Sequence, residues 1–534
     1  MTNQEIAKIF SKTADLLEIK GENPFKVRAY RNAARIIENS SKDFNKLVKE
    51  GFDLTRLPGI GKDLSEYIKE IVTTGKFHKL EELQKEIPSG LVEMLSIEGL
   101  GPKRVRQIYD AFGVTSLEEL KKYAQSGELD KLPGFGPKLI EKILKGVKQL
   151  KKAGIRFLWA EVEEIAEELR KYLLKFEGVE IVEIAGSYRR KKETVGDLDI
   201  LVVAKDYPKV SEYFIKFPKV KEVYSAGLTR STVFLENSLQ VDLRAVSKES
   251  YGAALHYFTG SKAHNIEIRK IAIEKGLKVN EYGVYRGDKK IAGATEEEVY
   301  SAVGLAYIEP ELRENRGEIE AAKEKKLPVL VQLKDIKGDL NLYFTDREAI
   351  REAIKLGYEY IGIKDLTSSF RFRKIKVLKI QEVEILEDGS VEAIDSRADV
   401  VIGVIKNFNQ NDQTQRIVKS MDFINILAHP SNRIIGKRDG IKANWSEIFA
   451  AAKEKKVALE VDSRPDRLDL NDVLIKEAVE SGVKIIVNSC AENLESLNNV
   501  KYGINQARRG WAQKDDIVNT YSLKNLLNFF SKSF

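Results

Sequence analysis

Two acidic residues spaced two apart, Asp197 and Asp199, are the residues of this sequence best suited to chemistry. They begin the run DLDILVV, which has the composition of a strand, and alternate residues of a strand face the same side. In the later run SLQVDLRAV, apolar and polar residues alternate, so a third carboxylate can lie beside the first two on a neighbouring strand. The apolar face would carry Leu239, Val241 and Leu243, and the polar face Gln240, Asp242 and Arg244.

Three carboxylates at one sheet edge repel one another unless cations bind between them. Two Mg²⁺ or Mn²⁺ ions about 3.5–4 Å apart would relieve this repulsion, activate an attacking hydroxyl and neutralise a triphosphate. Upstream, Gly186 and Ser187 offer backbone N–H groups and a hydroxyl, and Arg189 or Arg190 offers a forked donor for phosphate oxygens. A lone Asp-x-Asp is more often a solvated turn, but this combination predicts a nucleotidyl-transfer site.

A repeated glycine pattern indicates how the chain holds nucleic acid. The segments are LPGIGKDLSEYI (57–68), IEGLGPKRVRQI (97–108) and LPGFGPKLIEKI (132–143). Two glycines around one apolar residue allow a tight turn, and the helix that follows presents backbone N–H groups to a phosphate without reading sequence. The segments resemble helix-hairpin-helix motifs. The predicted DNA contacts are Gly59, Gly61, Lys62, Gly99, Gly101, Lys103, Gly134, Gly136 and Lys138.

The remaining patterns predict a multidomain α/β protein that positions these groups. Short helices broken by Gly-Pro pairs fill the first part of the chain, and mixed helices and strands surround the aspartates. After residue 327, the strand-like runs PVLVQL, YIGIKD, VVIGVI, VALEVD and KIIVNS are interspersed with helical stretches such as DREAIREAIKLG and SEIFAAAKEKK. This alternation predicts βα units in a parallel sheet or barrel.

Length and composition limit the class of protein. A chain of 534 residues suggests about three or four domains, and a net charge of +7 permits a polyanionic partner without requiring one. The chain shows no apolar run of the roughly 18 residues that a membrane span needs, and its N-terminus lacks the pattern of a signal peptide. One cysteine, Cys490, excludes an intramolecular disulfide and favours a reducing, cytoplasmic location.

The motif G-S-Y-R-R followed by G-D-L-D-I resembles the signature of the family X DNA polymerases, which are similar to polymerase β. The segment YFTGSKAHNIEIRKIAIEKGLKVNEYGVY (257–285) resembles that family's nucleotide-selecting segment. The resemblance covers nearly the whole chain. It implies that Asp197 and Asp199 bind two metal ions, and that Asp242 binds the catalytic ion and helps to activate the primer 3′-hydroxyl.

The same resemblance implies contacts with the incoming nucleotide and with DNA. Ser187 and Arg190 would hold the β- and γ-phosphates, and Asn265 would reach the minor-groove edge of the base. Lys262 and His264, which flank Asn265, depart from polymerase β, so fidelity and dNTP affinity are expected to differ. The other implied contacts are Tyr257, Phe258 and Gly260 at the sugar, where an aromatic ring or a backbone carbonyl would exclude a 2′-hydroxyl, and Arg244 and Arg269 on DNA.

Some members of the family also carry a 5′-deoxyribose-phosphate lyase, whose lysine forms a Schiff base. Here the nucleophile position carries Tyr67, and the nearby Lys62 and Lys69 lie on other faces of the predicted helix. We therefore expect no strong lyase. A 5′-phosphate pocket formed by Lys26, Arg28 and Lys62 remains open, as does the alternative that these are solvated charges.

The C-terminal region resembles the PHP (polymerase and histidinol phosphatase) domain, on segments such as GDLNLYFTD, AHPSNRIIG and VDSRPDRLDLND. An active PHP domain holds a metal cluster with His and carboxylate ligands at barrel strand ends. Only Glu382 and His429 fit here, with Asp346 as a third candidate, so we expect the metals and the 3′–5′ exonuclease or phosphoesterase activity to be lost. The alternative is a residual single-metal site at Glu382 and His429. The residues that replace the expected ligands are Asn341, Tyr343, Leu366, Lys406, Cys490 and Glu492.

The sequence therefore predicts a monomeric, prokaryotic DNA polymerase that adds dNTPs to gapped or primer-template DNA. The resemblance to the family implies that it fills short gaps in base excision repair. The alternatives are a noncatalytic DNA-binding scaffold and a template-independent or RNA-directed nucleotidyltransferase. The predicted domains are 1–90 and 91–155 (helix-hairpin-helix regions), 156–248 (nucleotidyltransferase palm, α+β), 249–310 (nucleotide-selecting subdomain), 311–326 (helical linker) and 327–534 (βα barrel of PHP type).

Overall fold

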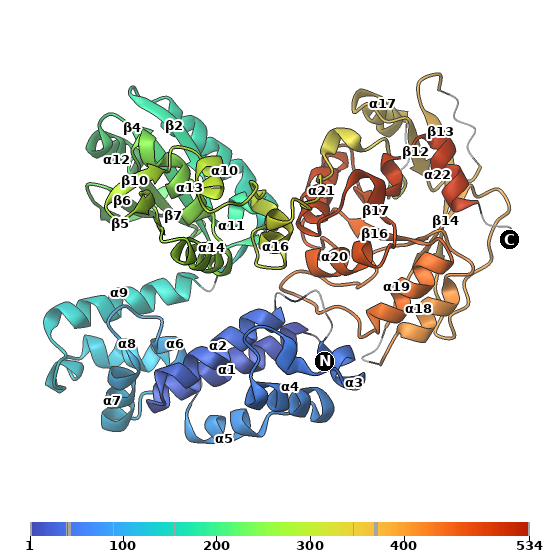
Figure 1. Cartoon of the computed structure of the whole chain (residues 1–534). Coiled ribbons are helices and arrows are strands. Elements are labelled where there is room, and N and C mark those ends of the chain that lie inside the picture. Colours follow the sequence, from blue (N-terminus) through green and yellow to red (C-terminus); the bar gives the residue numbers. More distant parts are fainter. Residues whose placement is uncertain are drawn as a thin grey trace. The chain divides into compact units, whose positions relative to one another are not determined.

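The computed structural model describes residues 3–38, 40, 44–88, 90–153, 155–344, 347–367, 372–408 and 411–531. The chain divides into two compact units (Figure 1). The first unit is Met1–Arg156 with the segments Lys219–Val223 and Val233–Gln240, and the second unit comprises the remaining residues. Among the described residues, the helices are all too short or too polar to span a membrane.

Up to residue 153, the described part of the first unit is helical, and glycine turns precede three of its helices. Gly59, Gly99 and Gly134 have φ values of +87°, +91° and +84°, which a residue with a Cβ rarely adopts. The three predicted hairpins are therefore confirmed. The helices are α1 (Asn3–Lys20), α2 (Pro24–Glu38), α3 (Phe44–Lys49), η1 (Leu54–Arg56), α4 (Lys62–Thr74), α5 (His78–Glu86), α6 (Gly90–Met94), α7 (Pro102–Phe112), α8 (Leu117–Gln125), η2 (Leu129–Lys131) and α9 (Pro137–Ala153).

The palm is a five-stranded sheet in the order β2-β4-β7-β6-β5. The predicted alternation in β7 is confirmed on its apolar face, because Leu239, Val241 and Leu243 are fully buried. The palm elements are β1 (Phe157–Leu158), α10 (Trp159–Leu174), β2 (Val179–Ile184), α11 (Gly186–Arg189), β3 (Thr194–Val195), β4 (Asp197–Ala204), α12 (Tyr207–Phe214), β5 (Val220–Ala226), β6 (Arg230–Leu235), β7 (Gln240–Ala245) and η3 (Lys248–Ser250).

The next subdomain packs helices against a three-stranded antiparallel sheet, with Val284, Val299 and Tyr300 in its core. The segment 311–326, predicted as a linker, buries charged side chains such as Glu311, Arg313 and Glu318. The elements are α13 (Tyr251–Thr259), α14 (Lys262–Glu274), β8 (Lys278–Asn280), β9 (Gly283–Arg286), β10 (Lys289–Ala292), α15 (Glu296–Ala302), η4 (Pro310–Leu312) and α16 (Glu318–Lys323).

The C-terminal region is a nearly closed barrel of seven parallel strands in sequence order, which confirms the prediction of a PHP-type barrel. Alternate residues such as Tyr360, Ile380 and Ile402 fill the interior together with Leu526 and Phe530 of the last helix. The strands are β11 (Gly338–Asp339), β12 (Tyr360–Ile363), β13 (Lys376–Glu384), β14 (Val400–Val404), β15 (Ile426–Leu427), β16 (Ala458–Asp462) and β17 (Ile485–Asn488).

Helices surround the barrel and bury apolar residues against the outer face of the strands (Figure 1). They include the predicted stretches at α17 and α19. The helices are η5 (Leu333–Asp335), α17 (Arg347–Lys355), α18 (Thr414–Ser420), α19 (Trp445–Glu454), α20 (Asp472–Glu480), η6 (Glu495–Asn499), α21 (Val500–Arg509), η7 (Lys514–Asp516), η8 (Val518–Thr520) and α22 (Leu523–Phe530).

One predicted strand is wrong. The run PVLVQL forms no strand, and its one ladder contact is an isolated bridge between Leu330 and Gln513. The reason is that its apolar residues serve two cores, with Leu330 packed in the core of the preceding subdomain and Val331 in that of the barrel. The first barrel strand is instead the short β11.

Candidate active site

The three predicted aspartates lie on neighbouring strands of the palm, β4 and β7. Burial, and then the negative charges of Asp197 and Asp242, raise the pKa of Asp199 to about 7. Asp242 is only 4% exposed and accepts hydrogen bonds from Thr232 and from Arg230, whose Nη2 lies 3.1 Å from Oδ2. The aspartates thus form a concentration of negative charge whose members sense one another.

The spacing of these carboxylates differs from that of a closed metal cage. The carboxylate oxygens of the three aspartates do not all lie within 4.8 Å of one another. Among the described residues, the ligand atoms of His429, Glu460 and Asp462 do. Asp242 faces the guanidinium of Arg230, which is half exposed and sits on the adjacent strand β6. A cation that takes this side of the trio would compete with Arg230 for the same carboxylate.

Gly186 lies directly against one of the carboxylates. Its φ is +63°, and a Cβ at this position would lie 2.9 Å from Oδ2 of Asp199. The backbone N–H of Ala185 also donates to the carbonyl of Asp199 at 2.7 Å. The Gly-Ser pair is therefore fitted to the aspartates, and Ser187 follows in the first turn of α11.

Arg189 and Arg190 have different surroundings. Arg189 donates to Glu296 through both terminal nitrogens, at 3.0 and 2.7 Å, and to the hydroxyl of Thr259 at 2.8 Å. Burial alone would raise the pKa of Glu296, but Arg313 and Arg189 lower it to about 2. Both terminal nitrogens of Arg189 are therefore occupied by Glu296. Of the two arginines, Arg190 is the better placed to bind a ligand.

Arg190 is held at two nitrogens. Its Nε donates to Oε1 of Glu314 at 3.0 Å, and its Nη1 donates to the carbonyl of Thr259. Gly260 leaves room for this contact, because a Cβ there would lie 3.2 Å from Nη1. Among the described residues, Nη2 is the guanidinium nitrogen of Arg190 without a protein hydrogen bond.

The predicted sugar contacts, Tyr257 and Phe258, are half-buried at the end of α13, with ring centroids 5.1 Å apart in a T-shaped arrangement. The side-chain amide of Asn265 donates to the carbonyl of Tyr257 at 2.7 Å. Its Oδ1 is buried without a hydrogen-bond partner in the part of the chain described. Tyr257, Phe258 and Asn265 therefore lie together, and Oδ1 of Asn265 is available to accept a hydrogen bond.

The two predicted DNA contacts in the second unit, Arg244 and Arg269, lie in different surroundings. The guanidinium of Arg244 lies 4.4 Å from the ring centroid of Phe258, so it is close to the predicted sugar contact. Arg269 is exposed one turn after Asn265. His264, by contrast, is fully buried between Glu318, at 2.8 Å, and the hydroxyl of Tyr300, at 2.9 Å. Its departure from polymerase β is explained by packing.

In the first unit, the glycines and lysines of the hairpins are exposed at the helix starts. Gly61 and Gly101 are the N-cap residues of α4 and α7. Lys62, Lys103 and Lys138 each occupy the first or second position of a helix and are exposed. This geometry suits a backbone phosphate at each hairpin.

A cleft of the first unit surrounds the first hairpin, with Thr55, Arg56 and Lys62 in its wall. Tyr67, at the predicted lyase position, is part of an aromatic cluster with Tyr30 and Phe77, at centroid distances of 6.0 and 5.3 Å. Tyr67 therefore has a packing role. Lys26 pairs with Glu22 at 3.4 Å, and Arg28 stacks on Phe25 at 5.1 Å.

In the barrel, Glu382 and His429 have separate partners. Glu382 pairs with Lys364, whose Nζ is 2.6 Å away. His429 instead forms a group with Glu460 and Asp462, whose ligand atoms all lie within 4.8 Å of one another. The sequence analysis missed these two acids, although they alternate at the end of the predicted strand VALEVD and so share a face.

Cationic side chains are attached to these barrel carboxylates. Arg464 forms two parallel hydrogen bonds with Asp462, at 3.1 and 2.6 Å. Tyr343 lies between Lys364 and Arg464, at 3.7 and 5.2 Å from its ring centroid. Arg464 therefore takes lone pairs that an ion at Asp462 would need.

The remaining replaced positions add no ligand to this group. Asn341 donates to Glu460 at 2.8 Å, and Lys406 lies 3.7 Å from Glu384. Cys490 is fully buried, and burial raises the pKa of its thiol. Leu366 and Glu492 belong to the described residues but not to the His429 group, and Asp346 lies outside the described residues.

Four family models match the chain: DNA polymerase beta palm at residues 156–275, DNA polymerase beta thumb at 254–314, a helix-hairpin-helix domain at 1–77, and a SAM-like helix-hairpin-helix tandem at 91–149. The chain is 34% identical over its full length to the full length of DNA polymerase/3′-5′ exonuclease PolX of Bacillus subtilis.

Two DNA polymerases lambda are more distant relatives. That of Arabidopsis thaliana is 27% identical over 58% of this chain and 62% of its own length. The DNA polymerase lambda of Rattus norvegicus is also 27% identical, over 52% of this chain and 51% of its own length. With a full-length relative above 30% identity, and with palm, thumb and hairpin models in the expected order, this chain belongs to the family X DNA polymerases.

Proposed function

We propose that the chain is a DNA-directed DNA polymerase that adds dNTPs to a primer 3′-hydroxyl with two divalent metal ions, and that it fills short gaps during repair. The observation that carries the proposal is the placement of Asp197, Asp199 and Asp242 on the neighbouring strands β4 and β7. Burial, and then the charges of Asp197 and Asp242, raise the pKa of Asp199 to about 7. This unbalanced negative charge is what divalent cations neutralise. The cation is Mg²⁺ or Mn²⁺, and the chain acts as a monomer.

The residues around the aspartates have distinct tasks in this reaction. Asp197, Asp199 and Asp242 would hold the ions, which would neutralise the triphosphate and favour ionisation of the 3′-hydroxyl. Arg190 offers Nη2 to the β- or γ-phosphate, while Glu314 and the Thr259 carbonyl fix its guanidinium plane. Charge and position, rather than a covalent intermediate, would carry the rate enhancement.

The other side chains would select the nucleotide. Tyr257 and Phe258 close the space beside C2′, which disfavours a 2′-hydroxyl, and Asn265 is tied to the same segment through the Tyr257 carbonyl. Three exposed hairpins that bind phosphate without reading sequence suit a DNA substrate with two duplex ends, such as a gap. A lyase is not part of the proposal, because Tyr67 is packed in an aromatic cluster.

Primer extension tests the proposed reaction. A labelled primer is offered in a one-nucleotide gap, in an open primer-template and as a bare single strand, first with dNTPs and then with NTPs. We expect extension to be fastest in the gap, to follow the template and to favour dNTPs. Extension of the bare strand as fast as of the gap would indicate a template-independent transferase, and no extension of any substrate would favour a noncatalytic scaffold.

The barrel is proposed to lack nuclease activity of its own. Lys364 and Arg464 neutralise Glu382 and Asp462, the positive charges oppose cation binding, and one histidine cannot hold a polynuclear centre. A single ion at His429, Glu460 and Asp462 is the competing arrangement. The printed name of the Bacillus relative includes a 3′-5′ exonuclease, so the barrel needs its own test.

The barrel test uses a polymerase-deficient background. Chains that carry Asp242→Asn, with and without His429→Ala, are incubated with end-labelled DNA and Mn²⁺. We expect no shortening of the 3′ end by either chain. Manganese-dependent shortening that disappears with His429→Ala would contradict the proposal and place a nuclease in the barrel.

A further inference from the structure

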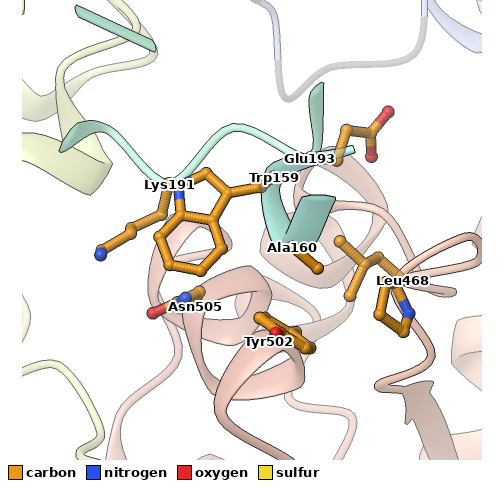
Figure 2. A pocket seen from close by; sticks show the side chains of 8 residues that line it. Trp159, Ala160, Lys191, Glu193, Leu468, Tyr502 and Asn505 are labelled. Carbon is orange, nitrogen blue, oxygen red and sulfur yellow. The ribbon is translucent and has the colours of Figure 1, made fainter. Parts of the chain in front are cut away.

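Within the second unit, the palm packs directly against the barrel along α21. Trp159 lies 5.8 Å from Tyr502 between ring centroids, and Glu163 accepts hydrogen bonds from Lys501 at 2.6 Å and from the hydroxyl of Tyr502 at 2.9 Å. Figure 2 shows Trp159 and Lys191 facing Tyr502 and Asn505 across this contact. We call it the palm–barrel interface.

At the end of α21, Arg509 reaches the residue that we propose binds the nucleotide. Its Nη1 donates to the backbone carbonyl of Arg190 at 2.7 Å and to Oε1 of Glu314 at 3.1 Å. The same Glu314 oxygen accepts from Nε of Arg190 at 3.0 Å. One barrel arginine therefore restrains Arg190 at its backbone and, through Glu314, at its side chain.

Arg509 is itself held rigidly. Its Nη2 donates to Oδ2 of Asp472 at 2.6 Å, and the same oxygen accepts from Arg316 at 2.7 Å. The side chains of Arg509 and Arg316 are only 3% and 4% exposed. Burial alone would raise the pKa of Glu314, but Arg509 and Arg190 lower it well below its ordinary value. The network is thus fully charged, buried and geometrically specified.

From this geometry we propose that Arg509 of the barrel is a positioning residue for nucleotide binding in the palm, acting on Arg190 through Glu314. The inference rests on the proposed function. Without Arg509, the Glu314 carboxylate would lose one of its two arginine hydrogen-bond partners, and the backbone carbonyl of Arg190 would lose its side-chain donor. Arg190 would keep its bonds to Glu314 and to the Thr259 carbonyl, but its backbone and the Glu314 carboxylate would be less firmly fixed, so its guanidinium would be less well oriented toward the phosphates. The barrel would therefore contribute to dNTP affinity whatever its own chemistry.

Steady-state gap filling with Arg509→Gln and Arg508→Gln tests the inference. Each substitution breaks an ion pair between α21 and the segment 309–316, since Arg508 pairs with Glu311 at 2.8 Å and Arg509 with Glu314 at 3.1 Å. Arg509→Gln also removes the pair with Asp472, and only Arg509 contacts Arg190. We expect Arg509→Gln to raise the KM for dNTP about tenfold, the size of one lost charged hydrogen bond, with kcat within about twofold of wild type. We expect Arg508→Gln to leave the KM unchanged.

Glu314→Gln provides a second, volume-conserving variant in case Arg509→Gln does not fold. It should raise the KM for dNTP as well, since it weakens the grip on Nε of Arg190. Equal KM values for Arg509→Gln and Arg508→Gln, or an unchanged KM for Glu314→Gln, would overturn the inference while wild-type extension upholds the proposed function. No extension by the wild-type chain would overturn the proposed function, and this inference with it.

Discussion

Replacement of Asp242 by Asn is expected to reduce the rate of nucleotide addition by about a thousandfold, as expected when a preorganised charge is removed from an active site. Asn keeps the shape of the side chain and can still accept a hydrogen bond from Thr232, but it no longer carries the charge that an ion and the 3′-hydroxyl require. Single-turnover extension of a gapped duplex with Mg²⁺ measures this rate.

A matched control shows whether the effect comes from losing the charge of Asp242 or from losing any aspartate charge in the palm. Asp206→Asn changes the same residue type in the same domain, at the N-cap of α12, where Asn caps a helix as well as Asp does. We expect this variant to extend primers like the wild type. If Asp242→Asn were as active as Asp206→Asn, residue 242 would not bind the catalytic ion.

Gly186→Ala is expected to lower kcat/KM by about a hundredfold, the effect of displacing a catalytic group by roughly 1 Å. The added Cβ would lie 2.9 Å from Oδ2 of Asp199, so the carboxylate must move. The left-handed φ of +63° adds a backbone penalty of about 1 kcal/mol to the folded state. Thermal unfolding measures the loss of stability, and gap-filling kinetics measure the loss of kcat/KM.

Gly178→Ala distinguishes the two effects expected of Gly186→Ala, which are displacement of Asp199 and backbone strain. Gly178 precedes the same strand, β2, and has a φ of +88°, but the nearest atom to a Cβ there is Lys205 Cβ at 3.8 Å. We expect the same small loss of stability with no loss of activity. If both alanine variants lost activity equally, backbone strain would account for the result and the contact with Asp199 would not matter.

Local patterns predicted most of what lies within a single element. The alternation in DLDILVV and SLQVDLRAV placed the aspartates on strands β4 and β7, because side-chain direction in a strand depends only on residue parity. The hairpins at Gly59, Gly99 and Gly134 were equally visible, because their positive φ values require glycine. The barrel followed from the repetition of buried strands and amphipathic helices.

Features that depend on docking between distant segments were not predictable in this way. Arg190 and Arg509 are 319 residues apart, and nothing in either local sequence indicates that one contacts the other. The same holds for Lys364 beside Glu382, which decides whether that carboxylate can accept a cation. The run PVLVQL was misread because an apolar segment that bridges two cores has the composition of a buried strand.

The buried Cys490 has a practical consequence for spectroscopy. It is the sole sulfhydryl of the chain and is fully shielded, so thiol-reactive dyes should leave the native protein unmodified. A cysteine engineered on an exposed hairpin lysine and another on the palm would therefore accept fluorophores without background labelling. Energy transfer between the two dyes would then report any change in their separation when a gap is bound.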